Sequence, residues 1–398
     1  MKRYWKISVI SIVMVIVLGT YFLQSSLAAK NDVTIKIEKI SGDDAELNDL
    51  IIYGDYQLGD LLQSFKQVSK EETVIFNNQS FLEQLLHTTA NPVLKRLIDE
   101  HRNFMRGKDL ITNNFYEDEN LLAYATIKSK NPFSSVRSFS FEMEVLNKKS
   151  NKTIKVEYDI PEKERVNWIE IANVEVINEQ IKVMSQTSLL DGGSELSVYT
   201  FDLKAKNFVN KEEILSTSHT ENRWEGLRVV RDYSSIGGKN YVLMLKENSE
   251  IKQVEENGYY YQEEELIAKE QYVLNVETNE YKEIKKSDEE LRFDSAVIVG
   301  SSIFVPVLLE KGFELHQYDI EKDEWSAKEV FNRPDMKNGF ESSFLKLMNG
   351  KFYLTYLSND GHSLFIGDME TGETLYEGKL KVDSANYSED SLNIHDIE

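Results

Sequence analysis

The chain has 398 residues, of which 41% are hydrophobic and 29% charged, a composition typical of a folded protein with a large core or two domains. Its formal charge of −22 excludes nucleic acid and other polyanions as preferred partners. Because there is no cysteine, disulfides, thiol catalysis and thiolate metal sites are excluded as well.

The N-terminal segment has the pattern of an export signal. Lys2, Arg3 and Lys6 precede an apolar run over residues 7–23, and small residues follow up to Ala29. The run is 17 residues long, at the lower limit for spanning a bilayer. Residues 1–29 are therefore either a cleaved signal peptide or a retained signal anchor. In both cases the basic start places residues 30–398 outside the cytoplasm.

The first extended segment follows directly. Residues 33–40 carry apolar side chains at Val33, Ile35 and Ile37, the alternation of a half-buried strand. We expect this strand to pair with the strands near residues 375–382 and so to close the fold.

Between residues 59 and 108 the pattern becomes helical. Ser80 followed by Glu83 is a capping box. Asn91 and Pro92 predict the N-cap and first residue of a second helix, and Gly107 predicts its end. We predict a helical insertion over about residues 59–108. It either presents a partner site or plugs one mouth of the fold.

From residue 121 onward, short extended runs and tight turns repeat. An acid or amide ends a strand and begins a hairpin turn at Asn147, Asp202, Asn275, Asp319 and Asp368. The last two lie 49 residues apart, and the turns that precede them, at Ser301 and Gly350, share this period. Four short strands at a fixed period predict the blades of a β-propeller.

The units over residues 121–382 resemble the blades of bacterial extracytoplasmic β-propellers, similar in kind to kelch or YncE-like proteins. The likeness lies in period and strand order. The Trp-Asp dipeptide of other propeller repeats is absent, and Gly237-Gly238 matches the kelch glycine doublet only roughly. The resemblance implies an all-β fold, a β-propeller of about six or seven four-stranded blades with a short helical insertion and an N-terminal export or anchor helix. It assigns no functional residue. The rival fold is a pair of β-sandwiches.

Motifs of known chemistry are missing. The chain has no nucleophile elbow, zinc-protease motif, phosphate-binding loop or dinucleotide fingerprint, and its six histidines lack metal-ligand spacing. Asp319, Glu321 and Asp323 resemble only the start of a calcium loop, because the required glycine and distant glutamate do not follow. We interpret them as a hairpin turn and predict neither a cofactor nor a metal site.

One stretch concentrates basic and aromatic residues in this acidic chain. The candidate binding residues are His219, Arg223, Trp224, Arg228, Arg231 and Asp232. Arginine and tryptophan together favour contacts with carbohydrate or acidic peptide. The alternative is that these groups pair with neighbouring acids. A tyrosine cluster at residues 259–261, flanked by glutamates, is either an exposed binding tip or a lengthened, solvated hairpin.

Together these patterns favour a non-enzymatic binding module at the bacterial cell surface, accessory or sensory in role. Its expected partners are a protein, a peptide or a neutral glycan, and it would touch the membrane through an uncleaved N-terminal segment. The alternative is a carboxylate-based glycan hydrolase or lyase with its site in the propeller channel. An enzyme of that kind needs two or more acids converging in one pocket, whereas a binding module needs a broad face. A β-sandwich adhesin is a third, weaker hypothesis.

Overall fold

A computed structural model describes residues 13–14, 19–20, 34–48, 50–58, 61–68, 70, 72–75, 91–130, 138–161, 164–220, 222–231, 236, 238–256, 259–285, 287, 291–326, 328–337, 343–383 and 392–398. Most of the predicted export segment, the capping box at Ser80 and the candidate residue Asp232 lie outside these ranges. Within them, no helix has the length and apolar character needed to cross a membrane.

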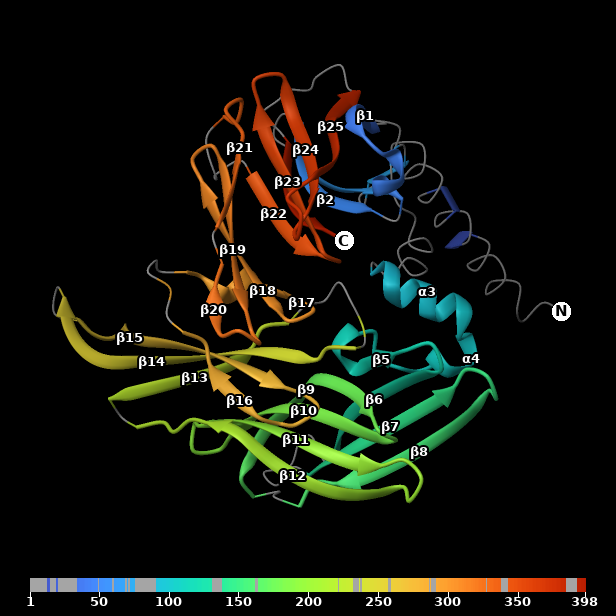
Figure 1. Cartoon of the computed structure of the whole chain (residues 1–398), viewed down its shortest axis with the longest axis vertical. Helices are drawn as coiled ribbons and strands as arrows, with labels where there is room; N and C mark the ends of the chain where they lie inside the picture. The colour runs from blue at the N-terminus through green and yellow to red at the C-terminus, as the bar shows by residue number, and fades with distance from the viewer. Residues whose placement is uncertain are drawn as a thin grey trace.

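The described strands form six antiparallel sheets that follow one another around a common centre (Figure 1). Sheet 1 comprises β2 (Ile51–Leu58), β3 (Leu61–Val68), β4 (Glu72–Ile75) and β26 (Leu392–Ile397). Sheet 2 comprises β5 (Phe115–Glu117), β6 (Leu121–Lys130), β7 (Ser138–Asn147) and β8 (Lys152–Asp159). Sheet 3 comprises β9 (Val166–Ile177), β10 (Gln180–Leu189), β11 (Ser194–Asp202) and β12 (Asn207–Ser216).

The other three sheets repeat the plan. Sheet 4 comprises β13 (Arg223–Val229), β14 (Tyr241–Glu256), β15 (Tyr259–Asn275) and β16 (Tyr281–Glu283). Sheet 5 comprises β17 (Val297–Val299), β18 (Ser302–Leu309), β19 (Gly312–Asp319), β20 (Glu324–Trp325) and β21 (Glu329–Asn332). Sheet 6 comprises β22 (Ser343–Met348), β23 (Lys351–Ser358), β24 (Gly361–Asp368), β25 (Thr374–Asp383) and β1 (Thr34–Gly42). The prediction of an all-β fold built from antiparallel, mostly four-stranded sheets is confirmed, and this sequential strand order is the one expected of a β-propeller.

The five predicted hairpin residues occupy equivalent positions in five sheets. Each accepts a hydrogen bond through its side-chain oxygen from a backbone N–H two or three residues later, as Asp368 does from Thr371 at 2.8 Å. The residue four positions later always has a positive φ. These residues are Asn151, Lys206, Asn279, Asp323 and Gly372. The repeat in the sequence is therefore a repeated turn, built from local side-chain and backbone chemistry.

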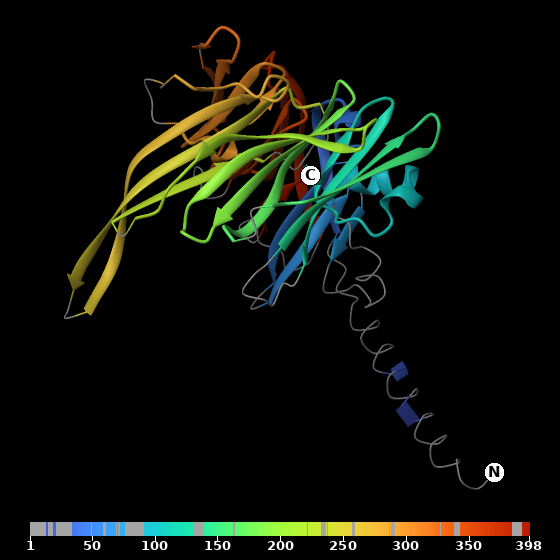
Figure 2. The same ribbon diagram turned by 90° about the horizontal axis from the view of Figure 1, so that it is seen from below.

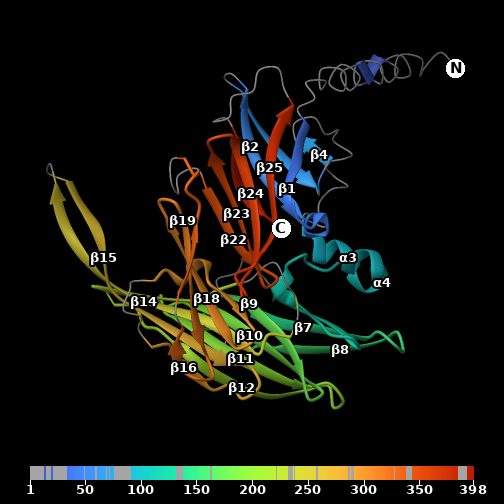
Figure 3. The same ribbon diagram turned by 45° about the horizontal axis from the view of Figure 1, so that its top comes forward.

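Both ends of the described chain are inserted into sheets made by the other end. β1 pairs with β25 from Thr34↔Asp383 to Gly42↔Tyr376, which confirms the predicted pairing (Figure 3). β26 in turn pairs with β2 from Ile52↔Ile397 to Tyr56↔Leu392. Ile35 and Ile37 of β1 are buried in the core between sheets 6 and 1.

The hydrophobic core lies between successive sheets, because central strands alternate their side chains between two neighbours. In sheet 4, Met244 packs toward sheet 3 whereas Leu243 and Leu245 pack toward sheet 5. Equivalent clusters join sheets 2 and 3, 5 and 6, and 6 and 1. None of the clusters formed by the described residues joins sheet 1 to sheet 2. There the helices α3 (Pro92–Glu100) and α4 (Arg102–Met105) pack on sheet 2.

The helical insertion is narrower than predicted. The N-cap at Asn91 is confirmed, since its side chain accepts hydrogen bonds from the backbone of Val93 and Leu94, but the helix breaks at His101. Residues 61–68 and 72–75 were expected within the insertion and instead form β3 and β4. Packing with distant residues favours the strand over a helix here, because Phe65 on β3 is buried in the core that sheet 1 shares with sheet 6.

Candidate functional site

A cavity of about 330 Å³ lies where the sheets converge. Its walls come from β9, from the end of β13 and the start of β14, from β17, from the turn after β22 and from the 3₁₀ turn Thr112–Asn114 that leads into β5. Strands of four sheets and the turn that leads into a fifth thus contribute to one space. Its size suits a ligand no larger than about one or two sugar rings.

Asn113 is the most unusual residue of the cavity wall. Its side chain is 3% exposed, and neither its amide nitrogen nor its amide oxygen has a hydrogen-bond partner. An unsatisfied buried amide costs about 1–3 kcal/mol. Both amide atoms are almost completely shielded from solvent, so Asn113 touches the cavity through its other atoms, and its unused donor and acceptor lie directly behind the wall.

Glu175 stands directly behind the wall and positions two of its members. Its Oε1 accepts hydrogen bonds from the side-chain amide of Asn173 at 3.2 Å and from the backbone N–H of Lys239 at 2.9 Å. Both donors line the cavity, whereas Glu175 itself is 3% exposed. Burial raises the pKa of Glu175 to about 7, against the opposing effect of these hydrogen bonds. The carboxyl is thus poised between its neutral and ionised forms near neutral pH.

Among the described residues, the cavity wall carries two basic side chains and no acidic one. Of the described lining residues only Arg231 and Lys239 are charged, and none carries a carboxylate. Arg231 is already paired with Glu170 of β9. The cavity is therefore lined mainly by amides, backbone groups and apolar side chains.

The predicted binding residues are spread along β13 rather than gathered at one point. Arg231 reaches the central cavity. Arg228 pairs with Asp294 and lies 3.8 Å from Glu247, and Arg223 lies 3.5 Å from Glu225. The ring of Trp224 lies over Gly226, leaving Trp224 36% exposed. Ion pairing with neighbouring acids, the alternative considered for this stretch, is thus present for all three arginines.

His219, the remaining described member of that set, is exposed and packs against Gly192 in the turn before β11. It does not line the cavity, but it lies beside the start of β13, since its neighbour Thr220 pairs with Arg223 and its neighbour Ser218 donates to Glu225. A binding role for the predicted set stays a prediction.

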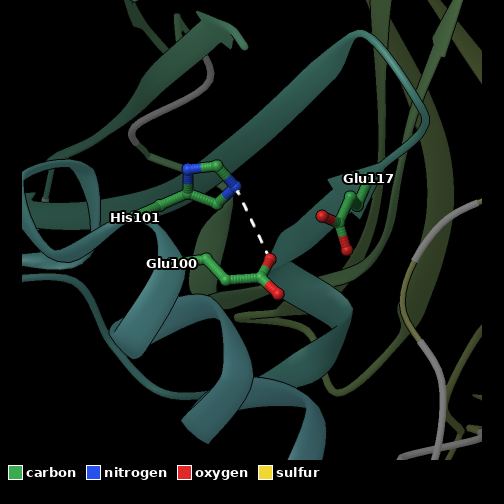
Figure 4. A group of neighbouring side chains, drawn as sticks. All are labelled: Glu100, His101 and Glu117. Atoms are coloured by element: carbon green, nitrogen blue, oxygen red, sulfur yellow. Dashed lines mark ion pairs between the residues drawn. The ribbon is translucent and has the colours of Figure 1, made fainter.

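One group of side chains has the spacing of metal ligands. Glu100, His101 and Glu117 each place a ligand atom within 4.8 Å of the others (Figure 4). Cations already neutralise this group, since Arg96 donates to Glu100 at 3.0 Å and Lys148 to Glu117 at 2.5 Å. Burial opposes the shift, but hydrogen bonds from Arg96 and Lys148 still lower the pKa of Glu117. The arrangement is that of an ion-pair network that fastens α3 to sheet 2.

The stretch that resembles the start of a calcium loop is also held by cations. Lys285, Tyr318 and Lys282 all donate to the carboxylate of Asp323 and lower its pKa, with Lys285 the largest contributor. These bonds tie the β19–β20 turn to the end of sheet 4, which agrees with the interpretation of a structural hairpin.

Sequence reasoning missed Asn113, Asn173 and Glu175. The first lies in a turn with no recognisable motif. The other two sit at alternate positions of β9, on either side of the buried Val174. Polar residues at alternate positions inside an apolar strand were the available signal, because alternate residues of a strand share one face and a buried polar face needs polar partners.

No protein-family model matches the chain, and no curated protein matches it. Solved structures similar to it include TolB from Acinetobacter baumannii, at 8% identity and a TM-score of 0.31 over 88% of this chain and 66% of TolB. The β-propeller domain of the Trilobed protease from Pyrococcus furiosus is 10% identical, with a TM-score of 0.29 over 89% of this chain and 86% of that domain. The polysaccharide lyase Uly1 is 9% identical, with a TM-score of 0.37 over 78% and 70%. At these low TM-scores the likeness adds nothing to what the sheet topology shows.

Proposed function

We propose that this chain is an exported β-propeller, with the six sheets as its blades, that binds a small neutral polar ligand in its central cavity and serves as an accessory or sensory module at the cell surface. The proposal is carried by the unsatisfied amide of Asn113 beside the cavity, which a rotation of this side chain would present to a ligand. An amide offers one acceptor and two donors, which match the hydroxyl and acetamido groups of a neutral sugar residue. The export pattern over residues 1–29 supports the location.

The absence of acids from the described cavity wall favours binding over glycan hydrolysis. A glycosidase needs two carboxyl groups about 5–10 Å apart that flank the scissile bond. Here Glu175 and Glu170 each contact a lining residue from behind the wall, Glu170 as the ion-pair partner of Arg231, and none of the described lining residues carries a carboxylate. The Glu175 pKa of about 7 suits a general acid or base, which is the one observation in favour of the hydrolase or lyase alternative.

The test is thermal unfolding of the purified protein with a panel of neutral monosaccharides and disaccharides that includes N-acetylglucosamine, with glucuronate as the anionic comparison. Asn113→Leu replaces the amide with an apolar group of similar size. Thr112→Val is the matched control, because Thr112 is also buried with an unsatisfied hydroxyl but does not line the cavity.

We expect at least one neutral sugar to stabilise the wild type and Thr112→Val but not Asn113→Leu. At a concentration one hundred times Kd, the stabilisation amounts to about 2.7 kcal/mol. A response of Asn113→Leu equal to that of the wild type would place the ligand elsewhere. A response to glucuronate alone would show an anion site instead. Release of reducing ends from a glycan, abolished by Glu175→Gln, would favour the enzymatic alternative.

The location has a separate test. Protease added to intact cells should cleave the protein if residues 30–398 lie outside the membrane, and fractionation of cells and medium should show whether the N-terminal segment is retained. Protection from protease until the cells are lysed would refute an extracytoplasmic location.

A further inference from the structure

The β14–β15 hairpin is much longer than its two neighbours in sheet 4. β14 and β15 pair from Tyr241↔Asn275 to Glu256↔Tyr259. β13 accompanies β14 only from Met244 to Glu250, and β16 accompanies β15 only at residues 272–274. The outer half is thus a two-stranded ribbon that extends away from the other sheets (Figure 2). Among the described residues no strand pairs with the outer edge of β15 over residues 259–270.

This free edge exposes apolar side chains. Residues 261–267 are all exposed, which means that both faces of the ribbon meet solvent. The exposed fractions are 45% for Tyr261, 48% for Leu266 and 60% for Ile267. An unpaired edge with apolar side chains is a template for pairing with another chain, and folded proteins usually protect such edges with charges, prolines or a covering element.

A groove runs beside the edge. It has a volume of about 810 Å³ and lies between residues 266–271 of β15 and residues 291–294, which lead into sheet 5, with residues 245–247 of β14 and the end of β16 completing its wall. Four acidic and four basic side chains line it, so the groove itself is balanced in charge and the acidic excess lies on the ribbon. Leu266 and Ile267 form part of its wall. The groove thus offers, side by side, the two elements of strand addition, an open backbone edge and space for the side chains of an added strand.

We propose that the free edge of β15 docks an extended, basic segment of another protein, which adds to the ribbon as a further strand. The acidic charge of the ribbon favours a basic segment over the other possible occupants. Residues 250–270 contain seven glutamates and only two lysines. A second copy of this chain would bring the same acids to the same edge and be repelled, whereas a segment that alternates lysine or arginine with apolar residues matches both the acids and the apolar positions. This site is independent of the central cavity.

The test uses the full chain and a fluorescent synthetic peptide of about ten residues that alternates lysine and valine. A lysine–proline peptide has the same charge but cannot form a strand, and a glutamate–valine peptide reverses the charge. Fluorescence anisotropy is measured for the wild type, for Ile267→Lys and for Glu264→Lys, both at exposed positions. Val209→Lys is the matched control, because Val209 is 48% exposed on β12, away from the ribbon.

We expect the lysine–valine peptide to bind the wild type and Val209→Lys equally, and each ribbon variant at least about tenfold more weakly. The lysine–proline and glutamate–valine peptides should bind the wild type more weakly by a similar factor. Equal binding of the lysine–proline peptide would show attraction by charge alone and overturn strand addition. Unchanged affinity in both ribbon variants would overturn the site. A wild-type dimer in sedimentation that Ile267→Lys dissolves would assign the edge to a second copy and also overturn the proposal.

Discussion

Glu175 makes the stability of the protein depend on pH in a way that a single substitution should remove. The carboxyl is 3% exposed, and burial raises its pKa from an ordinary value of 4.5 to about 7. The folded state therefore binds a proton more tightly than the unfolded state, and the free energy of unfolding falls as pH rises from 4.5 to 7. A pKa difference of this size corresponds to about 3 kcal/mol. Above pH 7 the full cost of the buried carboxylate is present.

Glu175→Gln keeps an oxygen that can accept from Lys239 and Asn173 but cannot ionise. We expect the variant to match the wild type near pH 4.5 and to be more stable by up to about 3 kcal/mol at pH 8. The assay is urea unfolding monitored by tryptophan fluorescence at several pH values between these limits. Glu164→Gln is the control, because Glu164 is an exposed carboxylate just before β9.

The difference in unfolding free energy between Glu175→Gln and the wild type isolates this one carboxyl from all other titrating groups. A difference that stays constant from pH 4.5 to 8 would refute the reasoning. So would an equal pH-dependent gain in Glu164→Gln, because the expected effect rests on burial of the carboxyl and Glu164 is exposed.

Three further predictions concern stability, each measured by chemical denaturation. Asp368→Ala removes the side-chain acceptor of a repeated turn and should cost about 1 kcal/mol, and a change below about 0.2 kcal/mol would contradict the role assigned to these residues. Ile37→Ala should lower the free energy of unfolding by about 2–5 kcal/mol, because Ile37 is buried. Ile40→Ala on the same strand should lower it by less than about 0.5 kcal/mol, because Ile40 is 57% exposed. Equal effects would mean that β1 is not part of the core. Lys182 of β10 donates to the carbonyls of Val276 and Glu277, which follow β15, at 2.9 and 2.7 Å. Lys182→Met leaves these acceptors unpaired and should lower the free energy of unfolding by about 1–3 kcal/mol. No change in stability would show that water replaces the ammonium group.

The parts of the fold that could be predicted from sequence depend on neighbouring residues. The turn at Asp319 is complete within five residues, because its side chain accepts from the backbone of Lys322 and its strand resumes after Asp323. The same holds for the N-cap at Asn91. The pairing of residues 33–40 was also predictable, since a ring of repeats must close and few strands remain at its ends.

The central cavity could not be predicted, because its walls come from residues more than 200 positions apart, such as Asn113 and Asn349. Nothing in the local sequence of either residue shows that it faces the other. The strand β3 was missed for a related reason, since Phe65 is held in extended conformation by partners from both ends of the chain. Long-range burial outweighed local propensity at this point.

The double insertion of the chain ends has a consequence for how the protein acquires its structure. Tyr53 and Glu398 are 345 positions apart yet share a hydrogen bond, and Ser41 contacts Glu377 across 336 positions. Contacts of such sequence separation form late and slowly, because the entropy of closing the whole loop must be overcome first. Sheets 1 and 6 therefore cannot be completed before residues 374–397 have been synthesised. Under the proposal that the chain is exported, it would cross the membrane with both pairings unformed, and sheets 1 and 6 would be completed together once residues 374–397 had emerged.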